Sequence, residues 1–226
     1  MKRSLNIEFV RAVRDFIFLL NNNYPERSVL KLVGDKYKLS GIERTMLYRG
    51  VTSEKESGFR KSKLVASIPD KNDLLHIDFC NQLYHIISYL KGNRVFISTD
   101  GVVRDASEFH GKKIHPDLIK KSIQLFSHYI NSNIQNRRVI YIDNQINIFP
   151  EIINQIEDSD VIMDKKTIVH PSLFVDKELT SQTSGIVATS DSQIIDNTNL
   201  YVFDLSRSIL EFHFQPVFFN LSSIVR

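Results

Sequence analysis

The sequence is poor in the features that mark secreted and membrane proteins. Its 226 residues include one cysteine, which excludes a disulfide framework and any zinc or iron–sulfur site built from several thiolates. The longest apolar run near its start, residues 16–20, is far below the ~20 residues that cross a bilayer. The start also lacks the small-residue cleavage pattern of a secretory signal. We therefore expect a cytoplasmic protein that makes no contact with a membrane.

The composition is that of a folded protein with an uneven charge distribution. A hydrophobic content of 42% excludes wholesale disorder, and the length predicts one domain, or one domain with a helical appendage. The net charge of +3 divides into +7 over residues 1–66 and −4 over residues 67–226. A basic part that holds a polyanion and an acidic part that binds metal would explain this division. A solvated surface rich in lysine and arginine would explain it equally well.

The chain divides into three parts by pattern. Residues 1–50 carry apolar residues at helical spacing with breaks near 21–23, 34 and 40–41, which predicts a helical region. Residues 51–72 are polar and without a period, which predicts a basic linker or mobile loop. Residues 73–226 alternate short apolar runs with amphipathic stretches and form the predicted α/β domain.

The α/β domain is expected to contain a mainly parallel sheet. Six strand-like runs are followed or separated by helical patterns, the clearest of which covers residues 116–133. Such an alternation predicts a three-layer α/β sandwich with helices on both faces of the sheet. The expected strands are residues 74–78, 94–98, 138–142, 185–189 and 201–205, with a further short strand at residues 160–163. The other expected helices are residues 150–156 and 171–180.

Aspartates follow several of the expected strands. Asp78, Asp100, Asp143 and Asp191 each come directly after an apolar run. Strand carboxyl ends form the ligand-binding edge of an open α/β sheet, so these carboxylates are expected to converge there. Carboxylates held together repel one another unless a cation neutralises them, and hard oxygen ligands favour Mg²⁺ or Mn²⁺. Each aspartate is equally explained as a cap of the helix that follows it.

Two segments resemble known protein families. Residues 185–196, Gly-Ile-Val-Ala-Thr-Ser-Asp-Ser-Gln-Ile-Ile-Asp, resemble the closing acidic motif of PIN-domain-like nucleases, in which a strand leads into Thr-x-Asp. Residues 98–111, Ser-Thr-Asp-Gly-Val-Val-Arg-Asp-Ala-Ser-Glu-Phe-His-Gly, resemble the prokaryotic PIN-like family called domain of unknown function 434. The helical segments 30–40 and 43–50 resemble the same family. The resemblance implies a PIN-like fold with an N-terminal helical extension.

The resemblance also implies a set of site residues. Asp78 corresponds to the metal ligand after the first strand. Asn81 corresponds to the asparagine that accompanies it and is expected to bind nucleic acid. Asp176 and Asp191 correspond to the third and fourth acidic positions. The family of unknown function adds three residues of its own, which are Asp100, Arg104 and Asp105. The further candidate metal ligands are Asp100, Asp143 and Asp196.

The sequence departs from the PIN pattern at two places. The expected Asp-Gly-x-Asn reads Asp78-Phe79-Cys80-Asn81, which places bulk beside the site. The small, serine-rich stretch expected after Asp143 is replaced by residues 144–150. Both departures raise the alternative of a degenerate site.

The function implied is divalent-metal-dependent hydrolysis of RNA, with Mg²⁺ or Mn²⁺ activating a water molecule. Two alternatives stay open. One is a nucleic-acid-binding module without catalysis, and the other is a small-molecule phosphohydrolase. The phosphohydrolase is disfavoured because the sequence has neither a glycine-rich phosphate loop of the Gly-x-x-x-x-Gly-Lys type nor Asp-x-Asp at the first strand.

Basic residues beside aromatic ones suggest a surface for single-stranded RNA. Arg60, Lys61 and Lys63 follow Phe59, and such pairs contact phosphates while rings stack on bases. Arg104 would contact phosphate or pair with an acid. Alternatively, the same basic residues form a charged surface that is solvated and binds no RNA. The apolar C-terminal residues 212–219 form either a core strand or a homodimer face.

Overall fold

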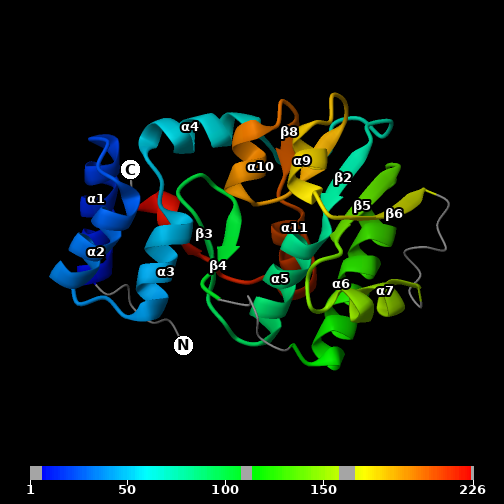
Figure 1. The fold of residues 1–226 in the computed structure, drawn as a ribbon, viewed down its shortest axis with the longest axis horizontal. Helices are drawn as coiled ribbons and strands as arrows, with labels where there is room; N and C mark the ends of the chain where they lie inside the picture. The colour runs from blue at the N-terminus through cyan, green and yellow to red at the C-terminus, as the bar shows by residue number, and fades with distance from the viewer. Residues whose placement is uncertain (1–6, 108–113, 158–165, 225–226) are drawn as a thin grey trace. The chain divides into compact units, whose positions relative to one another are not determined.

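The computed structural model describes residues 7–107, 114–157 and 166–224, and the chain forms two compact units (Figure 1). We call residues 1–62, 92–107 and 217–226 the N-terminal unit, and residues 63–91 and 108–216 the sheet unit. The N-terminal unit is therefore not a simple extension, because it also takes in an internal segment and the end of the chain. In the described parts of the chain, no helix is long and apolar enough to span a bilayer.

Helices α1 (Ile7–Asn21), α2 (Glu26–Lys36), α3 (Gly41–Gly50) and α4 (Glu54–Lys63) dominate the N-terminal unit. Each of the first three buries an apolar stripe, as the helical spacing predicts. Ser40 and Glu43 form a reciprocal capping box at the start of α3. These helices confirm the helical character predicted for the first 50 residues.

Helix α4 occupies part of the expected linker. Ser53 and Glu56 bond to each other's backbone N–H at its start, in the manner of a capping box. The helix buries the polar residues Ser57 and Arg60 instead of an apolar stripe. A helix with a polar buried face has no hydrophobic period, which is why the sequence pattern indicated a loop.

A three-stranded sheet completes the N-terminal unit. Its central strand β3 (Val95–Ile97) pairs antiparallel with β4 (Val103–Asp105) and parallel with β9 (Phe219–Asn220), which leads into the 3-10 turn η1 (Leu221–Ser223). The strand expected at residues 94–98 is therefore present. The expectation that it belongs to the main parallel sheet is wrong, because its backbone pairs with β4 and β9 instead.

The sheet unit contains a six-stranded, wholly parallel sheet. The strand order is β1 (Leu64–Val65), β8 (Tyr201–Phe203), β7 (Ile186–Ala188), β2 (Leu75–Asp78), β5 (Arg138–Asp143) and β6 (Thr167–Ser172). The α/β fold with a parallel sheet is confirmed. Strand β6 was not expected, because it is an edge strand with largely exposed side chains. It includes the first two residues of the helix expected at 171–180, which begins only at Val175. The short strand expected at residues 160–163 lies outside the described residues.

Helices cover both faces of this sheet, which confirms the three-layer arrangement (Figure 1). Successive residues of β5 point to opposite faces. Ile140 and Ile142 join the larger core, whereas Tyr141 packs in a second core with Leu179 and Ile194. The larger core includes α5 (Phe79–Leu90), α6 (Pro116–Asn133), α7 (Phe149–Glu157) and α11 (Leu205–Phe214), and the second core includes α9 (Val175–Thr180) and α10 (Ser192–Asn197).

The strand order reverses direction at β2. From β2 the chain proceeds outward to β5 and then to β6, and it afterwards returns to the other side of β2 to form β7 and then β8. The carboxyl ends of β2 and β7 therefore flank a topological switch point, where ligands bind in open α/β sheets.

Candidate functional site

Asp78 is the last residue of β2 and lies at the switch point. Its side chain is buried, and Oδ2 accepts a 2.8 Å hydrogen bond from the hydroxyl of Thr189, directly after β7. Burial raises the pKa of Asp78 to about 7, and the charges of Asp191 and Asp176 act in the same direction. The Thr189 hydroxyl and the backbone of Asn81 act in the opposite direction. Asp78 is thus a buried carboxyl group whose pKa is raised by burial and by the charges of two further aspartates.

Asn81 joins the ends of the two central strands. Its Oδ1 accepts hydrogen bonds from the backbone N–H of Ser190 at 3.0 Å and from the Ser190 hydroxyl at 2.9 Å. The side chain of Gln82 donates to the same oxygen. The sequence predicts a role for Asn81 in binding nucleic acid, and the structure places its amide oxygen on the loop that precedes Asp191.

Asp191 is the N-cap of α10. Its Oδ1 accepts from the backbone N–H of Gln193 at 2.7 Å and of Ile194 at 3.4 Å. The capping role is therefore confirmed, and the role of Asp191 as a metal ligand stays a prediction. Its negative charge also raises the pKa of Asp78.

Asp176 and Asp143 complete the group. Asp176 is exposed in the first turn of α9, and partial burial together with the charges of Asp191 and Asp143 raises its pKa. Asp143 ends β5, and its Oδ1 accepts a 2.8 Å bond from the backbone N–H of Gln145. We call Asp78, Asp143, Asp176 and Asp191 the acidic edge. Asp196, also predicted as a ligand, is exposed at the end of α10, and its charge acts on Lys63.

The chemistry of the four carboxylates suits a metal ion, whereas their spacing does not provide a complete set of protein ligands. Four carboxylates are the hard oxygen donors that Mg²⁺ and Mn²⁺ prefer. Within the described residues, however, no three His, Cys, Asp or Glu side chains are close enough to hold an ion together. Mg²⁺ commonly keeps several waters and takes one or two carboxylates plus substrate phosphates. Among the described residues the acidic edge offers no closed cage of protein ligands, so a cation there would need water and substrate oxygens as further ligands.

The two residues after Asp78, Phe79 and Cys80, belong to the core. The Phe79 ring packs edge-on against Phe126 with 5.0 Å between centroids. Cys80 is buried, and burial raises the pKa of its thiol to about 12, so it is a packing residue and no nucleophile. The departure from the Asp-Gly-x-Asn pattern therefore adds bulk to the interior between the sheet and α6.

Asp100 and Asp105 lie in the N-terminal unit, bound to arginines. Oδ2 of Asp100 lies 2.8 Å from Nη2 of Arg104 and 3.1 Å from Nη1 of Arg60, and the hydroxyl of Ser98 donates to Oδ1. All three charged side chains are buried. Burial raises the pKa of Asp100, but the two arginines and Ser98 lower it by more than burial raises it. The net shift of this pKa is therefore downward.

Asp105 is held in a similar way. Its Oδ1 lies 3.3 Å from Nη1 of Arg49 and accepts a 2.6 Å bond from the backbone N–H of Ser107. The structure thus gives the predicted ligands Asp100 and Asp105, and the predicted RNA-binding residues Arg60 and Arg104, partners inside the protein. Asp100 and Asp78 do not share a sheet edge, since β3 is outside the six-stranded sheet.

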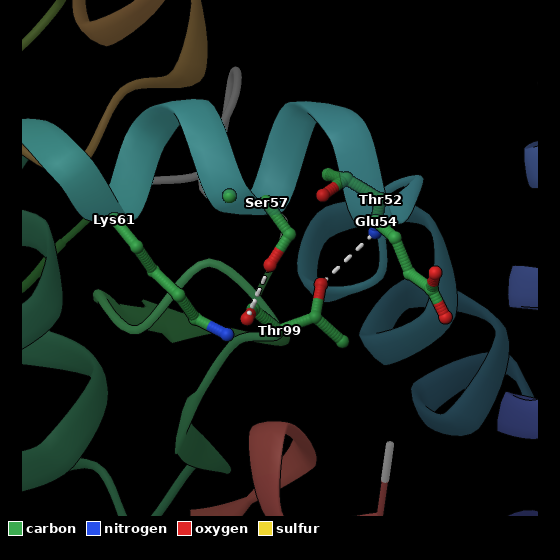
Figure 2. Close-up of a pocket in the computed structure, with 6 residues that line it drawn as sticks. Thr52, Glu54, Ser57, Lys61 and Thr99 are labelled. Carbon is green, nitrogen blue, oxygen red and sulfur yellow. Dashed lines mark hydrogen bonds between the residues drawn. The ribbon is translucent and has the colours of Figure 1, made fainter. Parts of the chain in front are cut away.

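The other predicted basic residues differ in their surroundings. Lys63 is the first residue of the sheet unit, and its Nζ donates to the carbonyls of Ile195 and Thr198 in the same unit. Lys61 is exposed and lines a cavity of about 140 Å³ in the N-terminal unit, whose walls are Thr52, Glu54, Ser57, Gly58, Lys61 and Thr99. Figure 2 shows Ser57 and Lys61 extending from α4 toward the segment of Thr99, whose carbonyl accepts from the Ser57 hydroxyl at 2.7 Å.

Two family models match the chain. Residues 8–63 match a family described as "Protein of unknown function (DUF434)", and residues 69–208 match "Domain of unknown function (DUF5616)". The chain belongs to the DUF5616 family, whose model covers more than half of it. The resemblance to the family numbered 434 is confirmed for the N-terminal helices. It is not supported for residues 98–111, which lie outside that match and within the DUF5616 match.

One relative is similar to this protein over nearly the whole chain. A protein of Methanocaldococcus jannaschii described as "Uncharacterized protein MJ0935" is 30% identical over 203 residues, which are 89% of this chain and 96% of the relative. No solved structure matches the chain. Neither matching family is described as a PIN domain.

Proposed function

We propose that this protein is a PIN-like ribonuclease that hydrolyses RNA phosphodiester bonds at the acidic edge with Mg²⁺ or Mn²⁺. The observation that carries the proposal is the placement of the four aspartates. They come from four separate chain segments and lie at the carboxyl edge of a parallel sheet whose order reverses beside Asp78. Substrate sites of open α/β proteins lie at such an edge.

Repulsion among the aspartates of the acidic edge supports the proposal that a cation binds there. Asp78 is buried within range of the charges of Asp176 and Asp191, and Asp176 is within range of Asp143 and Asp191. Gathering like charges destabilises a protein unless a counter-charge accompanies them. Within the described residues, the arginine pairs serve Asp100 and Asp105 in the other unit, and no salt bridge is formed by a member of the acidic edge.

Asp78 and Asp191 would hold the cation, with Asp143 and Asp176 as additional ligands through water. When bound, the cation lowers the pKa of a water molecule and neutralises the scissile phosphate. The Thr189 hydroxyl orients the Asp78 carboxylate, and Asn81 fixes the loop that carries Asp191. The protein therefore supplies preorganised carboxylates on the rigid ends of two adjacent strands.

One observation favours the alternative of a nucleic-acid-binding module without catalysis. In the described parts of the chain, no three acidic or imidazole side chains are close enough to bind a metal together. A binding module would bind RNA equally well with and without a chelator and would not cleave it.

Cleavage of labelled single-stranded RNA tests the proposal. We expect Mn²⁺-dependent cleavage by the wild type, loss of cleavage in EDTA, and loss in the Asp78→Asn/Asp191→Asn double variant. Asp117→Asn, an exposed aspartate on α6, is the matched control and should keep the wild-type rate. Absence of wild-type cleavage, together with no change in melting temperature on adding Mn²⁺, would overturn the metal site. Chelator-independent RNA binding without cleavage would establish the alternative.

A further inference from the structure

Two large apolar side chains lie exposed beside the acidic edge. Leu173 and Phe174 follow β6 directly and are 54% and 65% exposed. Ser172, the residue before them, pairs in register with Asp143 at the carboxyl end of β5. Asp176 comes two residues after Phe174. The aromatic ring is therefore attached to the same sheet edge as the aspartates and lies between two of them along the chain.

The backbone that carries Phe174 is held by a network of hydrogen bonds. The hydroxyl of Ser172 accepts from the backbone N–H of Phe174 at 2.9 Å and donates to Oε1 of Glu178 at 2.6 Å. Oε2 of Glu178 lies 2.7 Å from Nε2 of His170. The side chain of Gln145 donates to the Leu173 carbonyl at 3.0 Å. An exposed ring on a backbone fixed in this way is preorganised, so binding against it costs little additional ordering.

An exposed aromatic ring beside a phosphate-hydrolysing site has a specific use. Nucleobases stack on aromatic side chains without regard to sequence, because every base has a π face. Bases in a duplex are already stacked on one another, so only an unpaired base gains from such a ring.

We propose that Phe174, supported by Leu173, is a stacking platform for an unpaired base next to the scissile phosphate, and that it gives the protein a preference for single-stranded RNA. The inference rests on the proposed function, since it takes RNA as the ligand of the acidic edge. It assigns the substrate class of that site to single strands.

A tryptophan probe measures stacking without any requirement for activity. The sequence has no tryptophan, so Phe174→Trp introduces a single indole whose fluorescence a stacked base quenches. The titration uses single-stranded oligouridylate and oligoadenylate in the presence of Mg²⁺, because the proposed site needs a cation to approach phosphates. Tyr201→Trp is the matched control, because Tyr201 is 59% exposed and begins β8, at the opposite, amino edge of the same parallel sheet. We expect quenching in the first variant and none in the second.

Affinity measurements complete the test. Phe174→Ala should weaken binding of single-stranded RNA about 5- to 100-fold, Phe174→Tyr should restore it, and Tyr201→Ala should leave it unchanged. Binding of a duplex of the same sequence should be weak and unaffected by Phe174→Ala. If the wild type cleaves RNA but Phe174→Trp is not quenched and Phe174→Ala binds normally, the platform is overturned and the proposed function stands. If the wild type neither binds nor cleaves RNA, both proposals fail together.

Discussion

The hydroxyl of Thr189 donates a 2.8 Å hydrogen bond to Oδ2 of Asp78, and this bond joins the carboxyl ends of β7 and β2. Both side chains are buried. A hydrogen bond to a carboxylate favours its charged form, so Thr189 opposes the effect of burial on the pKa of Asp78. The ionisation of the acidic edge thus depends on a contact between residues 111 positions apart in the sequence.

Replacing Thr189 by the isosteric valine removes the hydrogen-bond donor of the buried Asp78 carboxylate. We expect the pKa of Asp78 to rise further. At pH 8 the folded protein should be destabilised by about 1–3 kcal/mol. The free energy of unfolding in urea measures the stability, and the carboxyl carbon resonance of Asp78 measures the pKa. Thr45→Val, which removes an exposed hydroxyl bonded to the Gly41 carbonyl, is the control and should change stability by less than about 0.5 kcal/mol. An unchanged titration of Asp78 would contradict the role given to Thr189.

The stability of the metal-free protein should fall with rising pH because of Asp78. Burial raises the folded-state pKa of this group from 3.8 to about 7, so between these values the folded state binds the proton that the unfolded chain has released. The stabilisation from the bound proton is complete below about pH 4 and is lost as the pH rises through 7. Asp78→Asn should remove this dependence and exceed the wild type by up to about 4 kcal/mol above pH 8.

Urea unfolding in EDTA at several values between pH 4 and pH 8.5 checks this prediction. Asp117→Asn, at an exposed position, should give a curve parallel to that of the wild type. A curve for Asp78→Asn that is also parallel to the wild type would show that Asp78 titrates normally in the folded state.

Asp100→Asn should destabilise the protein by about 3–5 kcal/mol, because it leaves the buried guanidinium groups of Arg60 and Arg104 without their shared carboxylate. Asp15→Asn, which disrupts an exposed pair with Lys36, should cost about 0–1 kcal/mol. Because the pKa of Asp100 is lowered on folding, its contribution is present at neutral pH and is lost as the pH falls below about 4.

The same variant tests the sequence-based prediction that Asp100 is a metal ligand. If Asp100 serves only the arginine pairs, Mn²⁺ should shift the melting temperatures of Asp100→Asn and of the wild type equally. A shift that is lost in Asp100→Asn and kept in Asp15→Asn would assign Asp100 to the metal site.

Gly185→Ala should destabilise the protein by about 1–3 kcal/mol. Gly185 has φ +96°, and a Cβ at this position would lie 2.2 Å from the carbonyl oxygen of Leu74. That carbonyl accepts the hydrogen bond from the Ile186 N–H that begins the β7–β2 pairing. Gly58→Ala is the matched control, since a Cβ there meets nothing within 4 Å, and alanine should stabilise α4 by up to about 1 kcal/mol. Equal melting temperatures for Gly185→Ala and the wild type would contradict this account.

Much of the sheet unit could be predicted because its signals are local. The helix expected at residues 116–133 has those bounds in the structure, and the strands before Asp78, Asp143 and Thr189 lie where their apolar runs predict. Parallel β/α alternation then brings the residues after each strand to one edge. The acidic edge could therefore be anticipated in large part from strand-end positions.

Other features had no local signal. Strand β6 is an edge strand with exposed side chains, so it lacks the apolar run that marks a buried strand. Phe174 was missed for the same reason, since it follows that strand. A signal was available in the adjacent apolar residues Leu173 and Phe174 just before the acidic position Asp176.

The sequence by itself determined the types and places of most helices and strands, because hydrophobic periodicity, caps and turn residues act over a few neighbouring positions. The tertiary structure alone decided which strands share a sheet and which charges meet. Asp100 and Asp78 each follow an apolar run, yet Asp100 is neutralised by two buried arginines, whereas the pKa of Asp78 is raised by burial and by the charges of other aspartates. That difference arises from backbone pairing and side-chain contacts between residues far apart in the chain, which no local pattern records.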